Sequence, residues 1–183
     1  LTIKVKPNPI ATQVQNVAVC PTNTIGGFNF TSTPVGATYT WTNTSNTIGL
    51  GLSGSGNIPS WNAPSNVSGG TTSGIISVIP TLNGCIGLPM NFTVSINPTP
   101  TLTVLTLDDT LCSGTATSIA LSSNVSGATF NWTVSQNNAT GATNGAGSTI
   151  VQNLTNNSTT PGLVTYTITV STGSCIRSEE HTS

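Results

Sequence analysis

The chain contains an internal repeat with a spacing of about 91 residues. Gly36–Thr42 (GATYTWT) recurs as Gly127–Thr133 (GATFNWT), and Ile3–Pro9 (IKVKPNP) recurs as Val94–Pro100 (VSINPTP). Two separate landmarks that agree on one offset are difficult to obtain by chance, even in a sequence rich in Thr, Ser and Asn. The repeat therefore predicts two similar domains in tandem, each of the size of a small β-sandwich of about 100 residues.

The repeat places the domain boundaries in the Pro-rich segments at residues 7–9 and 98–100. Proline lacks a backbone N–H and fixes φ, so it stiffens a linker and blocks strand pairing beyond it. We therefore expect residues 1–9 to be the last strand and linker of a preceding repeat. Residues 10–98 are expected to form the first repeat, and residues 99–176 the second.

Short alternating segments predict that both repeats are all-β. Apolar and polar residues alternate over Phe92–Ile96 and Tyr166–Val170, which is the period of a half-buried strand. Clusters of Gly, Asn and Ser at residues 49–57 and 137–148 are typical of turns. No ten-residue stretch keeps the 3.6-residue apolar period of a helix.

The last seven residues differ in composition from the rest of the chain. Residues 177–183 (RSEEHTS) contain the only Arg, the only His and both Glu. This heptapeptide resembles the translation of a common sequencing-library adapter, so we interpret it as an artefact outside the fold, the alternative being a genuine hydrophilic tail. Met90–Ile96 predicts a final strand in the first repeat, whereas the second reaches the heptapeptide directly after Ile176. The second repeat is therefore expected to be truncated before its last strand.

The near absence of charge excludes several classes of protein. The chain has only 3 Lys or Arg and 4 Asp or Glu among 183 residues. This composition excludes a basic nucleic-acid surface and a polybasic membrane patch, and no apolar run is long enough to span a membrane. General acid–base catalysis needs pairs of ionisable side chains, which are scarce here. We expect no enzyme, no catalytic residue, no cofactor and no membrane insertion.

Four cysteines occur as two per repeat, and the sequence predicts that they form disulfides. Zinc sites use closely spaced pairs, which are absent, and a catalytic thiol would need a basic neighbour. Disulfides indicate an oxidising, extracytoplasmic setting. Three connectivities are possible, and repeat symmetry favours Cys20 with Cys85 and Cys112 with Cys175.

The aromatic residues are predicted to form the core of each unit. Tyr39 and Trp41 in the first repeat match Phe130 and Trp132 in the second, and the two-residue spacing puts each pair on one face of a strand. Trp61 has an apolar counterpart, Val151, and Tyr166 lies in an alternating strand, so both are also assigned to the core. The functional alternative for the tryptophans is a sugar-stacking platform.

Asp108 and Asp109 are adjacent carboxylates that suggest calcium at first sight. Calcium takes six to eight oxygen ligands, usually from several carboxylates, and two neighbouring Asp cannot supply them. A turn or linker is the better interpretation, and no metal site is predicted.

These segments together resemble the PKD-like repeats of large surface proteins of gliding and related Bacteroidota. In the second unit the similar segments are Asp109–Thr115 (DTLCSGT), Ser118–Leu121 (SIAL), Val164–Val170 (VTYTITV) and Gly173–Cys175 (GSC). In the first unit they are Pro59–Trp61 (PSW), Gly74–Val78 (GIISV) and Asn83–Gly87 (NGCIG). The resemblance implies tandem immunoglobulin-like antiparallel β-sandwiches, secretion through the type IX route and a cell-surface location.

The resemblance also implies a non-catalytic structural or adhesion module that spaces or presents binding domains. Its expected partners are the neighbouring repeats of the same chain, with surface glycans or other proteins as further candidates and no nucleic acid. The alternative function is a carbohydrate-binding accessory module of a secreted polysaccharide-degrading enzyme. Exposed, coplanar tryptophans would favour that alternative, whereas buried tryptophans would favour the spacer.

Overall fold

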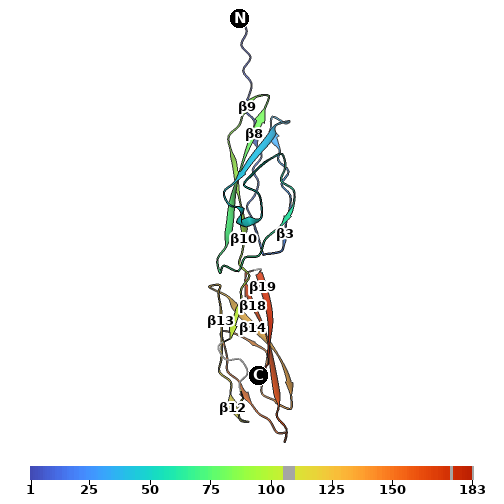
Figure 1. The fold of residues 1–183 in the computed structure, drawn as a ribbon, viewed down its shortest axis with the longest axis vertical. Helices are drawn as coiled ribbons and strands as arrows, with labels where there is room; N and C mark the ends of the chain where they lie inside the picture. The colour runs from blue at the N-terminus through green and yellow to red at the C-terminus, as the bar shows by residue number, and fades with distance from the viewer. Residues whose placement is uncertain (105–109, 174, 183) are drawn as a thin grey trace. The chain divides into compact units, whose positions relative to one another are not determined.

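The computed structural model describes residues 1–104, 110–173 and 175–182, and these form an all-β fold in two compact units (Figure 1). Unit 1 contains residues 1–66 and 70–98, and unit 2 contains residues 67–69 and 99–183. The only helical element among the described residues is a short 3₁₀ turn, η1 (Asn46–Ile48). The predicted all-β, immunoglobulin-like class is confirmed.

Unit 1 is a sandwich of one large sheet and two short strand pairs. The large sheet has the order β2-β10-β8-β5-β6, with β9 beside β8, while β1 pairs with β4 and β3 with β7. Its strands are β1 (Ile10–Ala11), β2 (Val17–Val19), β3 (Thr24–Ile25), β4 (Ser32–Thr33), β5 (Thr38–Asn43), β6 (Ser53–Ser55), β7 (Trp61–Asn62), β8 (Thr72–Leu82), β9 (Cys85–Ile86) and β10 (Met90–Ile96). All pairs are antiparallel except β2 with β10, which is parallel.

Unit 2 has a matching four-stranded sheet with the order β15-β14-β18-β19. The remaining strands pair as β11-β13-β16 and β12-β17. The bounds are β11 (Leu102–Val104), β12 (Thr115–Ala116), β13 (Ile119–Ser123), β14 (Thr129–Asn137), β15 (Gly145–Ala146), β16 (Thr149–Ile150), β17 (Asn153–Leu154), β18 (Leu163–Thr172) and β19 (Cys175–Thr182).

The core of each unit comes from the inward-facing residues of its long strands. In β10, Phe92, Val94 and Ile96 are buried and their alternate neighbours are not, as the sequence period predicts. In β18, Tyr166, Ile168 and Val170 are buried in the same alternating pattern. Buried apolar side chains of this kind contribute about 1.5–3 kcal/mol each relative to exposure.

The two repeated tryptophans occupy equivalent positions. Trp41 lies opposite Val78 of β8 and Gly54 of β6, and Trp132 lies opposite Ile168 of β18 and Gly145 of β15. Their exposed fractions are 8% and 7%. A Cβ atom at Gly54 or Gly145 would collide with the indole ring, so each glycine is required by the close approach of its tryptophan.

The C-terminal segment corrects one prediction. Residues 175–182 form β19, which pairs with β18 from Thr172–Cys175 to Thr165–Thr182, so unit 2 does have a strand after Ile176. Backbone hydrogen bonding is available to almost any sequence, and this allows an unfavourable side-chain pattern to occupy the sheet edge. The pattern is unfavourable because His181 lies opposite the buried Tyr166, whereas unit 1 places Phe92 opposite Ile76 at the equivalent position.

Replacing Trp132 with alanine is expected to lower the free energy of unfolding of unit 2 by about 3–5 kcal/mol, because it leaves a large cavity in the core. Chemical denaturation followed by circular dichroism measures the change.

Replacing each tryptophan in turn with phenylalanine separates the contribution of ring packing to stability from that of the indole hydrogen bond. The indole Nε1 of Trp132 donates to the Thr143 carbonyl at 3.1 Å, whereas the buried Nε1 of Trp41 has no hydrogen-bond partner. Trp132→Phe should therefore cost about 0.5–1.5 kcal/mol more than Trp41→Phe. Equal losses of unfolding free energy in the two variants would show that the hydrogen bond from Trp132 to Thr143 does not stabilise unit 2.

Candidate functional site

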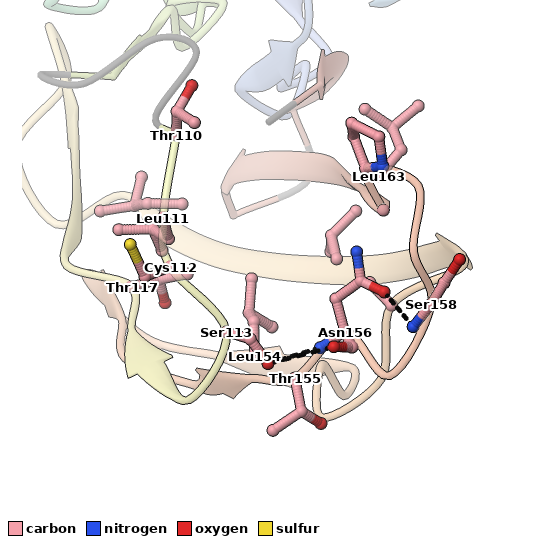
Figure 2. Close-up of a pocket in the computed structure, with 15 residues that line it drawn as sticks. Thr110, Leu111, Cys112, Ser113, Thr117, Leu154, Thr155, Asn156, Ser158 and Leu163 are labelled. Atoms are coloured by element: carbon pink, nitrogen blue, oxygen red, sulfur yellow. Dashed lines mark hydrogen bonds between the residues drawn. The ribbon is translucent and has the colours of Figure 1, made fainter.

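Unit 2 contains a cavity of about 500 Å³ between its sheets (Figure 2). Its apolar lining includes Leu111, Ile119, Leu154, Leu163 and Val164. Its polar lining includes Thr110, Ser113, Thr117, Thr155, Asn156 and Ser158. The cavity is thus formed by four segments: residues 110–119 around β12, Ala139 after β14, the end of β17 with the residues that follow it, and the start of β18.

Hydrogen bonds around Asn156 fix the polar rim of the cavity (Figure 2). The Asn156 N–H donates to Ser113 Oγ at 2.9 Å, and the Ser158 N–H donates to Asn156 Oδ1 at 2.7 Å. The Asn156 side-chain amide donates to the Thr160 carbonyl at 2.8 Å. These contacts join the loop between β17 and β18 to the segment before β12, so hydrogen bonds hold the rim in a defined conformation.

Behind the cavity, Thr117 connects the lining to the buried Tyr166. The Thr117 hydroxyl donates to the Ile150 carbonyl at 3.1 Å and accepts from the Gln152 N–H at 2.9 Å. The Tyr166 hydroxyl donates to Gln152 Oε1 at 3.0 Å. Burial raises the pKa of Tyr166 above its ordinary value of 10.0, and hydrogen bonding with Thr117 lowers it by a smaller amount.

The described residues that line the cavity form no acid–base pair and no metal-binding group. Among the described residues that line it, the Cys112 thiol is the single ionisable side chain. No group of three or more His, Cys, Asp or Glu gathers anywhere in the part of the chain that the structure describes. Asp108 and Asp109, assigned to a turn from the sequence, lie outside the described residues. The described lining is therefore largely neutral and combines apolar with hydroxyl and amide side chains.

The predicted disulfide pairing is wrong. Cys85 and Cys112 are free thiols, whereas Cys20 and Cys175 are disulfide-bonded. The predicted pairs therefore do not form.

Strand register gives the physical reason in unit 1. Cys20 follows Val19, which lies beside Ile96 of β10. Ile96 lies opposite Thr72, so Cys20 is near the start of β8. Cys85 lies opposite Leu82, at the other end of β8. Ten residues of extended strand span on the order of 30 Å, far beyond the roughly 7 Å limit between bridged Cα atoms.

The same reason applies in unit 2. Cys112 lines the cavity together with Val164 near the start of β18, and Cys175 lies opposite Thr172 at its end. Eight residues of strand separate these two places, on the order of 25 Å. Repeat symmetry could match the cysteines between units, but it could not show at which end of the sandwich each one lies.

The aromatic residues assigned to the core occupy two kinds of position. Trp41, Phe130, Trp132 and Tyr166 are buried, while Tyr39 and Trp61 are half-buried and pack against the core of unit 1. The Trp61 indole N–H donates to the Ile48 carbonyl at 2.8 Å. Its ring lies 6.1 Å from that of Phe28, centroid to centroid.

The comparisons with known proteins bear on unit 2. Residues 109–179 match the family model of the PKD-like domain. The match covers less than half of the chain and includes the strands that enclose the cavity. No curated protein matches the chain. PKD-like domains are typically extracellular adhesion or structural modules.

A solved structure titled Protocadherin Gamma B7 extracellular cadherin domains 1-4 is also similar, with 17% identity and a TM-score of 0.48. The alignment covers 96% of this chain and 48% of that chain, so the present chain spans about half its length. Among the described residues, no helix has the length and apolar character needed to cross a membrane.

Two thiols per chain should react with a maleimide under native, non-reducing conditions. Cys112 is exposed and Cys85 half-buried, so we expect Cys112 to react first. Peptide mass spectrometry identifies the modified residues, and Cys112→Ser should remove the fast phase alone. Finding four reactive thiols, or none, would contradict the assignment.

Alkaline pH should destabilise unit 2 through Tyr166. Because burial raises its folded pKa, the neutral form is favoured in the native state, and stability is lost as pH rises above about 10. Urea unfolding at pH 8 and pH 11 should show a smaller alkaline loss in Tyr166→Phe than in the parent. The same loss of stability in both proteins would show that ionisation of Tyr166 does not cause the alkaline destabilisation.

Proposed function

We propose that the chain is a non-catalytic extracellular module that spaces or presents binding domains at a bacterial cell surface. The observation that carries this proposal is the PKD-like match over residues 109–179, extended to unit 1 by the internal repeat. The bonded state of Cys20 and Cys175 supports an oxidising compartment and therefore secretion. Secretion by the type IX route and an origin in Bacteroidota are further parts of the proposal.

The geometry of the tryptophans favours a spacer over a carbohydrate-binding module. A sugar platform needs flat aromatic faces open to solvent, but Trp41 and Trp132 are buried beneath their neighbouring strands. Trp61 is half-buried, and its N–H is already bonded to the Ile48 carbonyl. The cavity of unit 2 is lined by aliphatic and hydroxyl side chains, and the described residues around it include no aromatic ring.

The proposed partners follow from the same features. A nearly uncharged surface offers little attraction for nucleic acid or anionic lipid, so contacts with neighbouring repeats and other proteins are the proposed interactions.

Antibody labelling of intact source cells, combined with a glycan array, tests the proposed function. We expect surface labelling that is lost after protease treatment of intact cells, and no glycan signal from the chain. A glycan signal that disappears in Trp61→Ala at unchanged thermal stability would instead establish the carbohydrate-binding function. Labelling seen only after the cells are permeabilised would contradict the surface location.

A further inference from the structure

The sequence contains two Asn-Gly pairs, Asn83-Gly84 in unit 1 and Asn144-Gly145 in unit 2. An asparagine that precedes glycine can react with its own backbone. Glycine has no side chain, so its amide nitrogen can approach the side-chain carbon of the asparagine closely. The two pairs have the same covalent chemistry, and any difference in their reactivity therefore comes from the fold.

Asn83 and Gly84 are the central residues of the hairpin that joins β8 to β9 (Figure 1). Leu82 lies opposite Cys85, and φ is +50° at Asn83 and +84° at Gly84, as in a two-residue turn with both central residues in the left-handed region. Both residues are exposed, and a Cβ atom at Gly84 would meet no heavy atom within 4 Å. The turn therefore projects into open space.

The two reacting groups of this pair are unrestrained by the described residues. The Asn83 side-chain amide has no hydrogen-bond partner among them, and the Gly84 N–H donates to none of their carbonyls. Lys6 Nζ donates to the backbone carbonyl of Asn83 at 3.3 Å, which leaves the side chain free. Strand β9 is only two residues long, so opening this hairpin end breaks few contacts and costs little free energy.

The side chain of the second pair is held in place. Asn144 Oδ1 accepts a hydrogen bond from the Val134 N–H at 2.9 Å. A Cβ atom at Gly145 would collide with the indole ring of Trp132, so this glycine lies in a tightly packed part of unit 2.

The nitrogen of the second pair is also restrained. Gly145 lies opposite Trp132, and two residues further on the Gly147 N–H donates to the Phe130 carbonyl at 3.1 Å. Hydrogen-bonded pairs recur at every second residue of an antiparallel ladder. The register therefore places the Gly145 N–H against the Trp132 carbonyl, where it cannot attack the side chain of Asn144.

We propose that Asn83 is a site of spontaneous modification, where the side-chain amide is lost and aspartate or isoaspartate forms, whereas Asn144 is protected. The Gly84 nitrogen attacks Asn83 Cγ, a bond forms between these two atoms, and the Cγ–Nδ2 bond breaks. The Gly84 amide proton passes to the departing nitrogen, so ammonia leaves and a five-membered succinimide remains. Water then opens the ring at either carbonyl, which gives aspartate or isoaspartate without any oxidant or reductant.

The modification changes both the charge and the geometry of this turn. Unit 1 contains Lys4 and Lys6 and no Asp or Glu, so its side-chain charge falls from +2 to +1. Isoaspartate also adds one carbon to the backbone. Turn geometry fixes the register of a hairpin, so the pairing of Leu82 with Cys85 should weaken. The site thus provides a slow change that records the age of each chain.

Incubation of the folded chain in mildly alkaline buffer tests the proposal, with peptide mass spectrometry and an isoaspartate methyltransferase assay as readouts. The Asn83 peptide should gain the mass difference between NH2 and OH, and faster at higher pH because the attacking amide must lose its proton. The Asn144 peptide should convert at least about tenfold more slowly, because its reaction first breaks two hydrogen bonds. Unfolding the chain in urea should remove this difference.

Two variants of the full chain provide matched controls. Asn83→Gln should abolish the conversion at this position and leave Asn144 unchanged, because the longer side chain would have to close a six-membered ring, which forms much less readily. Asn83→Asp has the charge of the product and is the reference for ion-exchange chromatography. Asn83 is exposed at a hairpin end, so both variants should fold, which circular dichroism checks.

Three results would overturn the proposal. The first is an unchanged Asn83 in the folded chain over a period in which the urea-unfolded chain converts. The others are equal conversion rates at Asn83 and Asn144 in the folded chain, and unchanged ammonia release from Asn83→Gln. The inference goes beyond the proposed function, because a surface spacer can exist with or without this modification. Cell labelling and the glycan array therefore fail or succeed independently of it.

Discussion

The antiparallel pairing of a tryptophan-bearing strand with the longest strand of its sheet organises both units. In unit 1 this pair is β5 with β8, and in unit 2 it is β14 with β18. The register fixes Trp41 and Trp132 against glycines of the next strand, which allows a large ring to lie close to the backbone. The remaining strands of the same sheet extend from the edges of this pair, so its register sets the positions of that sheet's inward-facing residues.

The interior of each sandwich could be predicted from the sequence because strand periodicity determines which side chains face inward. The alternation in β10 and β18, and the equivalence of Trp41 with Trp132, follow from this local rule. The cysteine pairing could not be predicted in the same way. It depends on which end of a strand each cysteine reaches, and the spacing of Cys20 and Cys85 along the chain contains no such information.

The edge of unit 2 shows a second limit of sequence reasoning. The pattern of residues 177–182 does not suit a strand that covers a core, yet these residues pair with β18 through their backbone. Residues 177–182 lack the alternating apolar pattern of Met90–Ile96, and the cavity of unit 2 had no other signal in the sequence. Its lining, from Leu111 to Val164, could be identified only once the fold had brought four separate segments together.

The parallel pairing of β2 with β10 has a consequence for the response of unit 1 to a pulling force. β2 lies near the beginning of the unit and β10 at its end, and Val17–Val19 runs alongside Val94–Ile96 in the same direction. Tension applied through the two ends of the unit pulls these strands in opposite directions along their length. Their hydrogen bonds are then loaded together in shear rather than opened one after another. In an array under flow, unit 1 would unfold only after all hydrogen bonds between β2 and β10 break together.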